Sequence, residues 1–303
     1  MRKVTGLLLC FTLLFGLAAA PALAADKRKV TLITMDQMDQ HWVNVDAGCK
    51  KAVEELGTID YTWMAPDVKD DAKQIECVNN AVAGGAEVLL VAANGPTAIS
   101  SALEAAAKEG VKILYVDSPA DFPGLQTLAT DNEAAGKTAG TQLLQALKAA
   151  GKAEGSIGII NVNAATASTV AREKGFRAAF EGSAFKLLEP QYCDGDAARA
   201  KDMAANFITQ GCVGLFGANE GSTVGVGNAI QEAGGAVIGV GFDKSDMILG
   251  LIKDGHLLCT MAQNPVVMGY EGMKSAARAL AGEELSPKMV DTGVSVLTKD
   301  KLF

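Results

Sequence analysis

The chain has little of what common catalytic and metal sites require. It contains two histidines, His41 and His256, and neither an HExxH nor a GxSxG sequence occurs. The GVG sequences at 225–227 and 239–241 lack the third glycine of a dinucleotide-binding loop, and the GKT sequence at Gly136 lacks the first glycine of a phosphate-binding loop. No run of acidic residues has the spacing of a calcium-binding loop. The sequence therefore gives no support for an enzyme, a bound metal or a cofactor.

Cysteine is scarce and is not arranged in pairs. Beyond residue 24 the chain has five cysteines, an odd number with no CxxC sequence: Cys49, Cys77, Cys193, Cys212 and Cys259. If the first strand lies between the second and third, Cys49 and Cys77 belong to helices on opposite faces of the sheet. Cys193 and Cys212 belong to strands that are not neighbours, and lie at opposite ends of them. We therefore expect free thiols, most of them buried.

Basic residues are outnumbered. The whole chain has 27 Lys and Arg against 35 Asp and Glu, which gives a net charge of −8. Without the first 24 residues the net charge is about −10, because Arg2 and Lys3 are then absent. Nucleic acid and anionic membrane surfaces both attract a positive face, so the charge argues against either as a partner.

One long apolar stretch is present, at the N-terminus. The basic start "MRK" is followed by "VTGLLLCFTLLFGLAAA" and then "PALA", in which Ala22 and Ala24 form the small-residue pattern of a signal-peptidase site. A lipoprotein signal at Cys10 is rejected, because Leu9 is not small and the cysteine precedes the end of the apolar region. No later run reaches about 18 apolar residues. We expect residues 1–24 to be a signal peptide and the protein from Ala25 onward to be exported and soluble.

Strand-like and helical segments alternate along the rest of the chain. The expected strands are 29–34, 59–65, 87–93, 112–118, 156–162, 185–193, 213–219, 237–243, 256–264 and 292–298. The expected helices lie near 40–56, 68–83, 96–109, 131–151, 167–182, 196–210, 222–234, 245–254 and 265–282. Strand–helix units of this length favour parallel sheets with right-handed crossovers. Two such series predict an α/β fold with two doubly wound parallel-sheet domains.

Polar side chains recur where these strands end. In open α/β sheets ligands bind outside the carboxyl ends of the strands. Both halves of the predicted fold contribute such residues, in "DQMDQHW", "VDSPADF", "ATASTVAREK", "FGANEGS", "GVGFDKSD" and "CTMAQNP". Each one alone has a simpler explanation: Asp36 or Asp39 caps the following helix, and Asn219 is part of a turn. Their joint occurrence in both halves favours a binding site between the two domains.

With these motifs in view, the chain resembles the periplasmic sugar-binding proteins of bacterial ABC importers, the type I periplasmic binding proteins, and within them the ribose-binding type. The resemblance covers essentially the whole chain after the signal peptide. It is carried by "LITMDQMDQHWVNVDAG", "AVAGGAEVLLVAAN", "ILYVDS", "TDNEAAGKTAG", "TASTVAREKGF", "LFGANEGSTVGV", "GVGFDKSDM" and "TMAQNP", in that order.

The resemblance implies two lobes joined by a three-segment hinge. We place the crossings near Thr130, Asn264 and Asp291. The N-terminal lobe is then 25–130 with 264–291, and the C-terminal lobe is 131–263 with 292–303. The ligand lies between the lobes, which close on it by hinge motion.

The resemblance also implies a set of ligand-binding residues at matching positions: Asp39, His41, Trp42, Asp117, Arg172, Asn219, Asp243 and Gln263. These types suit a sugar, because hydroxyl groups both donate and accept hydrogen bonds and aromatic planes pack against the C–H faces of the ring. Core packing is the alternative role for Trp42.

Three positions depart from the ribose-type pattern. Ser118 replaces an arginine, Gly195 replaces an aromatic residue of the second lobe, and His41 replaces one of two phenylalanines. The site keeps its carboxylates but loses a cation and a ring. An acidic site of this kind disfavours anionic ligands and favours a neutral sugar or polyol, or a cation. It also puts ribose itself in question.

The function that follows is capture of a small sugar or polyol in the periplasm and its delivery by a monomeric protein to the membrane permease of an ABC transporter. The alternative is a ligand-presenting receptor for chemotaxis or autoinducer sensing, in which a chemoreceptor takes the place of the permease. Related cytoplasmic repressors share the fold, but they carry a DNA-binding helix pair where this chain has the predicted signal peptide.

Overall fold

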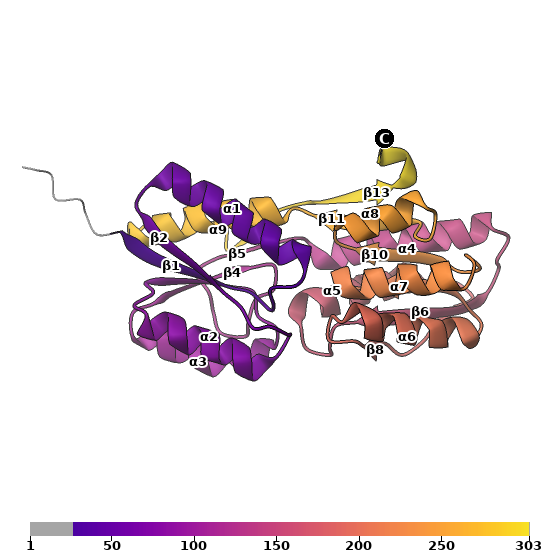
Figure 1. Ribbon diagram of the computed structural model, residues 1–303, viewed down its shortest axis with the longest axis horizontal. Coiled ribbons are helices and arrows are strands. Elements are labelled where there is room, and N and C mark those ends of the chain that lie inside the picture. The colour runs from indigo at the N-terminus through magenta and orange to yellow at the C-terminus, as the bar shows by residue number, and fades with distance from the viewer. Residues whose placement is uncertain (1–26, 303) are drawn as a thin grey trace, which may run out of the picture.

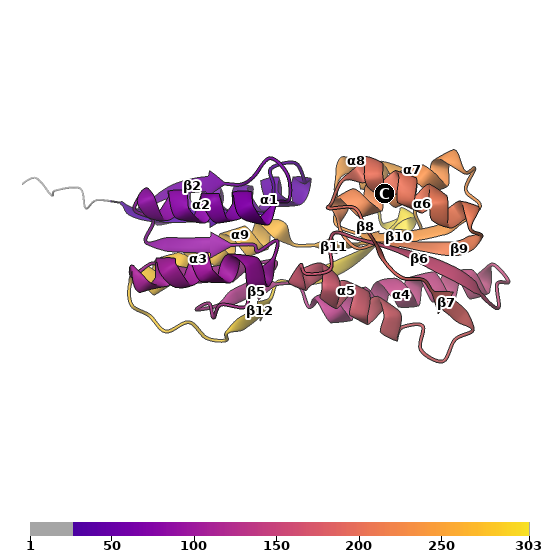
Figure 2. The ribbon, with the colours of Figure 1, turned by 90° about the horizontal axis from the view of Figure 1, so that it is seen from below.

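The computed structural model describes residues 27–302, which form two lobes arranged end to end (Figure 1). The predicted signal peptide lies outside this range. Each lobe is a sheet with helices on both faces (Figures 1 and 2). Between residues 27 and 302, no helix is both long enough and apolar enough to cross a membrane.

The N-terminal lobe contains a six-stranded parallel sheet. In spatial order its strands are β12 (Met289–Asp291), β5 (Thr127–Ala129), β4 (Lys112–Val116), β3 (Val88–Val91), β1 (Arg28–Ile33) and β2 (Ile59–Met64). Helices α1 (Gln40–Leu56) and α9 (Pro265–Leu280) cover one face, and α2 (Asp71–Ala83) and α3 (Pro96–Lys108) cover the other. Strand β1 lies between β2 and β3, as predicted.

The C-terminal lobe repeats this order. Its strands are β13 (Val294–Thr298), β11 (Cys259–Gln263), β10 (Ile238–Phe242), β9 (Cys212–Gly217), β6 (Gly155–Asn161) and β7 (Phe185–Leu187), and β8 (Gln191–Tyr192) also pairs with β6. Helices α4 (Asn132–Ala149) and α5 (Ala167–Ala178) lie on one face, and α6 (Ala197–Thr209), α7 (Glu220–Glu232) and α8 (Asp246–Lys253) on the other. All pairs are parallel except β11 with β13. A short 3-10 helix, Lys299–Lys301, follows β13.

The cores of both lobes are apolar strands packed under these helices. The sheet of the N-terminal lobe separates two apolar clusters. One includes Cys49 of α1, and Cys77 of α2 packs against the other. Cysteines 49, 77, 193, 212 and 259 are free thiols, and all but Cys77 are buried. The two helices therefore lie on opposite faces, as the strand order required.

Small differences from the predicted elements have local causes. Strands β5 and β12 were not predicted, because three residues are too few to show a pattern of apolar residues. The predicted strand 185–193 is divided into β7 and β8 around Pro190, which has no N–H to donate. Helix α7 begins at Glu220, two residues early, because the Asn219 side chain accepts from the N–H of Ser222.

Three segments connect the lobes (Figures 1 and 2). The first joins β5 to α4, the second joins β11 to α9, and the third joins β12 to β13. Because each sheet receives its last strand from a distant part of the chain, neither lobe is built from one continuous segment.

Candidate ligand site between the lobes

The predicted site residues converge on one cavity between the lobes. All eight line it: Asp39, His41, Trp42, Asp117, Arg172, Asn219, Asp243 and Gln263. They come from the segments that follow strands of both sheets, so parallel topology places residues far apart in sequence at one junction.

The lobes touch directly around this cavity. The hydroxyl of Ser118 donates to that of Ser168 at 2.6 Å, and the hydroxyl of Thr166 donates to the backbone oxygen of Asn94 at 2.7 Å. Each bond joins the N-terminal sheet's loops to those of the C-terminal sheet. The arrangement is therefore a closed one.

His41 bridges two carboxylates, one from each lobe. Its Nε2 lies 3.1 Å from Asp117 Oδ2, and its Nδ1 lies 3.5 Å from Asp243 Oδ1. Burial alone would lower the pKa of His41, but the two carboxylates outweigh it and the pKa is raised. The imidazole thus favours its charged form between the two aspartates.

Asp117 and Asp243 occupy equivalent places in the two lobes, directly after β4 and β10. Both are buried and both have left-handed backbone angles, with φ of 61° and 75°. Aspartate tolerates this conformation better than most residues. Burial would raise the pKa of Asp117, yet His41, Arg172 and the Ser118 hydroxyl hold it well below its ordinary value.

Arg172 is almost fully buried and lies in the middle of α5. Its Nε donates to Asn132 Oδ1 at 2.8 Å, its Nη1 donates to the backbone oxygen of Ala218 at 3.0 Å, and its guanidinium lies 4.4 Å from the centre of the Phe242 ring. The remaining nitrogen, Nη2, is 3.7 Å from Asp117 Oδ2 and has no hydrogen-bond partner within residues 27–302. The side chain is thus fixed with one donor unused.

Asn219 and Trp42 each present a further buried donor. The Asn219 oxygen caps α7, so the simple turn explanation is right for that atom, but its Nδ2 has no partner in the described chain. Trp42 packs in the N-terminal core and also lines the cavity, and its Nε1 is likewise unpartnered there. Its ring meets the His41 ring edge to face at 4.7 Å. Trp42 therefore packs in the core, the alternative role for its position, and also lies at the cavity wall.

Gln263 ties the cavity to the connecting segments. Its Nε2 donates to Asp243 Oδ1 at 2.6 Å, and its Oε1 accepts from the Thr130 hydroxyl at 2.9 Å. Thr130 lies on the connection between β5 and α4, and Gln263 is the last residue of β11, before the second connection. The cavity is thus bonded to residues at two of the three connections.

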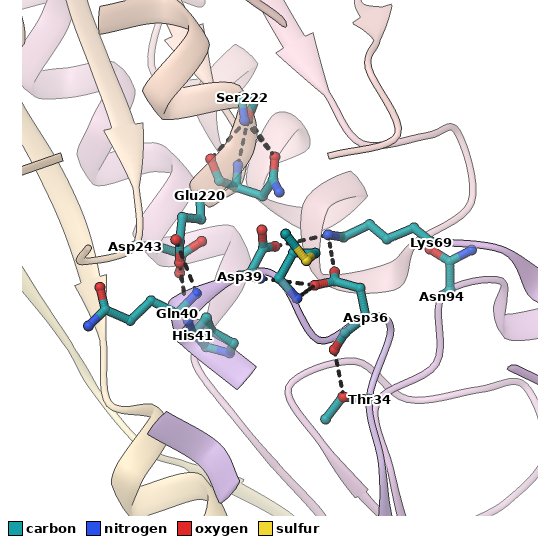
Figure 3. Close-up of polar contacts among 12 residues, drawn as sticks. Thr34, Asp36, Asp39, Gln40, His41, Lys69, Asn94, Glu220, Ser222 and Asp243 are labelled. Atoms are coloured by element: carbon teal, nitrogen blue, oxygen red, sulfur yellow. Dashed lines mark hydrogen bonds and ion pairs between the residues drawn. The ribbon is translucent and has the colours of Figure 1, made fainter. Parts of the chain in front are cut away.

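The "DQMDQHW" segment is not explained by helix capping alone. Asp39 is at the N-cap position of α1, but its side chain makes no capping bond. Instead Asp39 and Asp36 both form ion pairs with the ammonium of Lys69, and Asp36 accepts from the N–H groups of Met38 and Asp39 (Figure 3). Burial raises the pKa of Asp39, whereas Lys69 outweighs burial at Asp36 and lowers its pKa.

The start of α1 is capped from the opposite lobe. The N–H groups of Gln40 and His41 each donate at 3.1 Å to the carboxylate of Glu220, the first residue of α7 (Figure 3). Burial, with the nearby charges of Asp39 and Asp243, raises the pKa of Glu220 to about 7. Glu220 is therefore an acceptor that α1 has only while the lobes are together.

Sequence reasoning missed Lys69, which lies between β2 and α2 and lines the cavity. It also missed Asn94, after β3. Both follow strands of the N-terminal sheet, so the criterion that found Asp117 would have found them. They were not predicted because the ligand-binding positions implied by the family resemblance do not include them.

Across residues 27–302, no group of three or more His, Cys, Asp or Glu side chains is placed so that it could hold a metal ion.

Comparison with known proteins identifies the family of this chain. The model of the periplasmic binding protein domain matches residues 30–284. The chain belongs to this family of periplasmic binding proteins. They are binding proteins rather than enzymes.

Individual relatives cover nearly the whole chain. It is 29% identical to a ribose import binding protein of Haemophilus influenzae, over 95% of this chain and 97% of the relative. It is 26% identical to a D-allose-binding periplasmic protein of Escherichia coli, over 87% of each. Among solved structures, a carbohydrate transporter solute-binding protein of Agrobacterium radiobacter in complex with D-arabinose superposes with a TM-score of 0.87 at 31% identity, covering 92% of this chain and 97% of that one. The two-lobed fold of this binding protein is thus shared with its relatives.

Proposed function

We propose that this chain is the solute-binding protein of an ABC importer and that it binds a neutral monosaccharide between its lobes. The observation that carries the proposal is the convergence of eight polar and aromatic side chains from both lobes on one cavity. Relatives are named for ribose and allose, and one solved structure of the same fold is in complex with D-arabinose, which supports a sugar of this size.

Unused donors in the cavity wall support a hydroxyl-bearing ligand. Trp42, Arg172 and Asn219 each have a buried nitrogen without a partner among the described residues. A buried donor left unpaired costs about 1–3 kcal/mol, and a ligand oxygen would remove that cost. The aspartates supply the matching acceptors.

The charge balance supports a neutral ligand. Carboxylates outnumber cations around the cavity, because Asp36, Asp39, Asp117, Asp243 and Glu220 are opposed by Lys69 and Arg172, with His41 between them. The cations are already engaged by these carboxylates. An anionic ligand would meet net repulsion.

Binding is tested by isothermal titration calorimetry with D-ribose, D-arabinose and D-allose, with D-ribose 5-phosphate as the anionic control. We expect saturable one-to-one binding of at least one neutral sugar and no binding of D-ribose 5-phosphate. We also expect the melting temperature of the protein to rise with the concentration of that sugar. Failure to bind any sugar or polyol in a wider panel of pentoses, hexoses and alditols, or preference for the phosphate, would contradict the proposal.

We infer that the ligand is enclosed by hinge motion between lobes formed by 25–130 with 264–291 and by 131–263 with 292–303. This division is supported by the three connections, which fall between β5 and α4, β11 and α9, and β12 and β13. The direct bonds across the cavity would exist only in the closed form, which a bound sugar would favour.

The partner and the compartment follow from the same proposal. The monomeric protein would act in the periplasm and deliver its sugar to a membrane permease. Expression of the whole chain in a Gram-negative host tests the export step: we expect the protein in the periplasmic fraction with Ala25 as its first residue by mass spectrometry. Retention of residues 1–24 in the cytoplasm would contradict it.

A further inference from the structure

Lys69 crosses from the N-terminal lobe to the C-terminal lobe at one end of the cavity. Its side chain is 6% exposed although it belongs to a loop. A Cβ atom placed on Gly195 of the C-terminal lobe would lie 2.7 Å from Lys69 Nζ and 2.9 Å from its Cδ and Cε. The space that a side chain at Gly195 would take is therefore filled by Lys69.

Two carboxylates hold Lys69 in this position. Its ammonium pairs with Asp39 at 2.9 Å and with Asp36, and Asp36 is itself fixed by the N–H groups of Met38 and Asp39 (Figure 3). An ammonium has three donors, and the two carboxylates use two of them. Since Lys69 lines the cavity, the third donor is available to a ligand oxygen.

Lys69 and Asp39 also separate two spaces. Both residues line the cavity, and both line a second, larger and more open groove between the lobes. Gly195 and Glu220 lie on the wall of that second space. The ion pair is thus a partition between the cavity and a larger, more open groove.

We propose that Lys69 determines which sugars fit, by donating a hydrogen bond to the ligand and by closing the cavity against substituents that would extend toward Gly195. This rests on the proposed sugar-binding function. A single unsubstituted monosaccharide would lie on the cavity side of the partition. A sugar carrying an additional group on the hydroxyl that faces Lys69 meets the side chain and its two carboxylates.

Two substitutions separate the two roles. Lys69→Ala removes the donor and the wall, so the two spaces join. Lys69→Met removes the charge and the donor but keeps the length of the side chain. Lys73→Met is the matched control, because Lys73 is a nearby exposed lysine paired only with Asp67 at the surface.

The probes are the free sugar that wild-type protein binds best among D-ribose, D-arabinose and D-allose, and its mono-O-benzyl ethers at each hydroxyl in turn. Titration with each ether makes it unnecessary to know which hydroxyl faces Lys69. For the free sugar we expect Lys69→Ala and Lys69→Met to lose about tenfold to a hundredfold in affinity, as for loss of a charge-assisted hydrogen bond. For one ether we expect at least about tenfold tighter binding to Lys69→Ala than to wild type and to Lys69→Met.

Melting temperatures of the three variants show that each is folded. If the Lys69 variants bind the free sugar and every ether as wild type and Lys73→Met do, the assignment of Lys69 is wrong while the sugar-binding function stands. If wild-type protein binds no sugar at all, the proposed function is wrong and the role of Lys69 is lost with it.

Discussion

Asp243 makes contacts with several parts of the site. It follows β10 in a left-handed conformation, accepts from Gln263 at 2.6 Å and lies 3.5 Å from His41. It is thus in contact with the N-terminal lobe, with a connecting segment and with the cavity. Asp117 has the equivalent place in the other lobe, so the site is built around a pair of buried aspartates.

Replacing Asp243 tests the acceptor half of the site. Asp243→Asn keeps the shape and tolerates the left-handed backbone, but removes a charged acceptor and leaves His41 with one carboxylate. We expect sugar affinity to fall by about tenfold to a hundredfold, measured by titration calorimetry. Asp254→Asn, on an exposed carboxylate that follows α8, is the control and should leave affinity unchanged. Equal affinity of both variants would place the sugar elsewhere.

Individual residues were predictable from sequence to different degrees. Residues such as Asp117, Arg172 and Asp243 were found because a polar side chain after a parallel strand has a known place in the fold. Lys69 also follows a strand, so the same criterion applies to it, but its contact with the other lobe depends on the missing side chain of Gly195. A contact made possible by an empty space has no local pattern in the sequence.

At the scale of elements, α1 and α7 are linked across the cavity by Glu220. Its carboxylate is a cap for α1, because the first N–H groups of a helix have no partners within the helix. In the closed protein burial raises its pKa to about 7, and with the lobes apart water would return it toward its ordinary value of 4.5. The closed form therefore binds more protons than the open form between pH 4.5 and 7.

The sign of the pH effect follows from this difference. The closed form binds more protons than the open form between pH 4.5 and 7. Raising the pH through this range therefore favours the open form and weakens sugar binding. The raised pKa of His41 acts in the same direction at higher pH. We expect sugar affinity to fall by at least about tenfold from pH 5 to pH 8, and Glu220→Gln to flatten the change between pH 5 and 7. If sugar affinity changed with pH equally in Glu220→Gln and in wild type, the capping of α1 by Glu220 from the other lobe would be contradicted.

Helices α1 and α9 pack unusually closely through glycine. A Cβ atom on Gly269 would overlap the backbone oxygen of Val45, so a methyl group there forces the helices apart. Gly250, within α8, has no atom within 4 Å of its Cβ position. The two glycines thus offer a matched pair, one in contact and one free.

For Gly269→Ala we expect a loss of about 1–3 kcal/mol in the free energy of unfolding, because added volume in a packed contact strains both helices. For Gly250→Ala we expect a gain of roughly 0.5–1 kcal/mol, because alanine loses less chain entropy on folding. Melting temperature measures both. A rise for Gly269→Ala would show that α1 and α9 are not in this contact.

Elements were easier to predict than single contacts. Helices such as α3 began where predicted, because Pro96 is an ordinary residue for the first turn of a helix. The three-residue strands β5 and β12 were missed, since their pairing depends on segments more than 150 residues apart. Local pattern determines a long helix, but a short edge strand depends on what lies beside it.

The whole molecule is two copies of one strand order, with the last strand of each sheet supplied after a crossing between lobes. This arrangement gives three connections rather than one. We infer that it limits the relative motion of the lobes to a hinge, and His41 lies between the two aspartates. The central claim is that this junction encloses an uncharged sugar.

A crystal structure of the protein grown with the sugar that binds most tightly in solution tests this claim most directly. We predict electron density for one sugar ring in the cavity, with hydroxyl groups within hydrogen-bond distance of Asp39, Arg172 and Asp243. Density for the sugar on an outer surface, with these three side chains contacting only protein, would contradict the account.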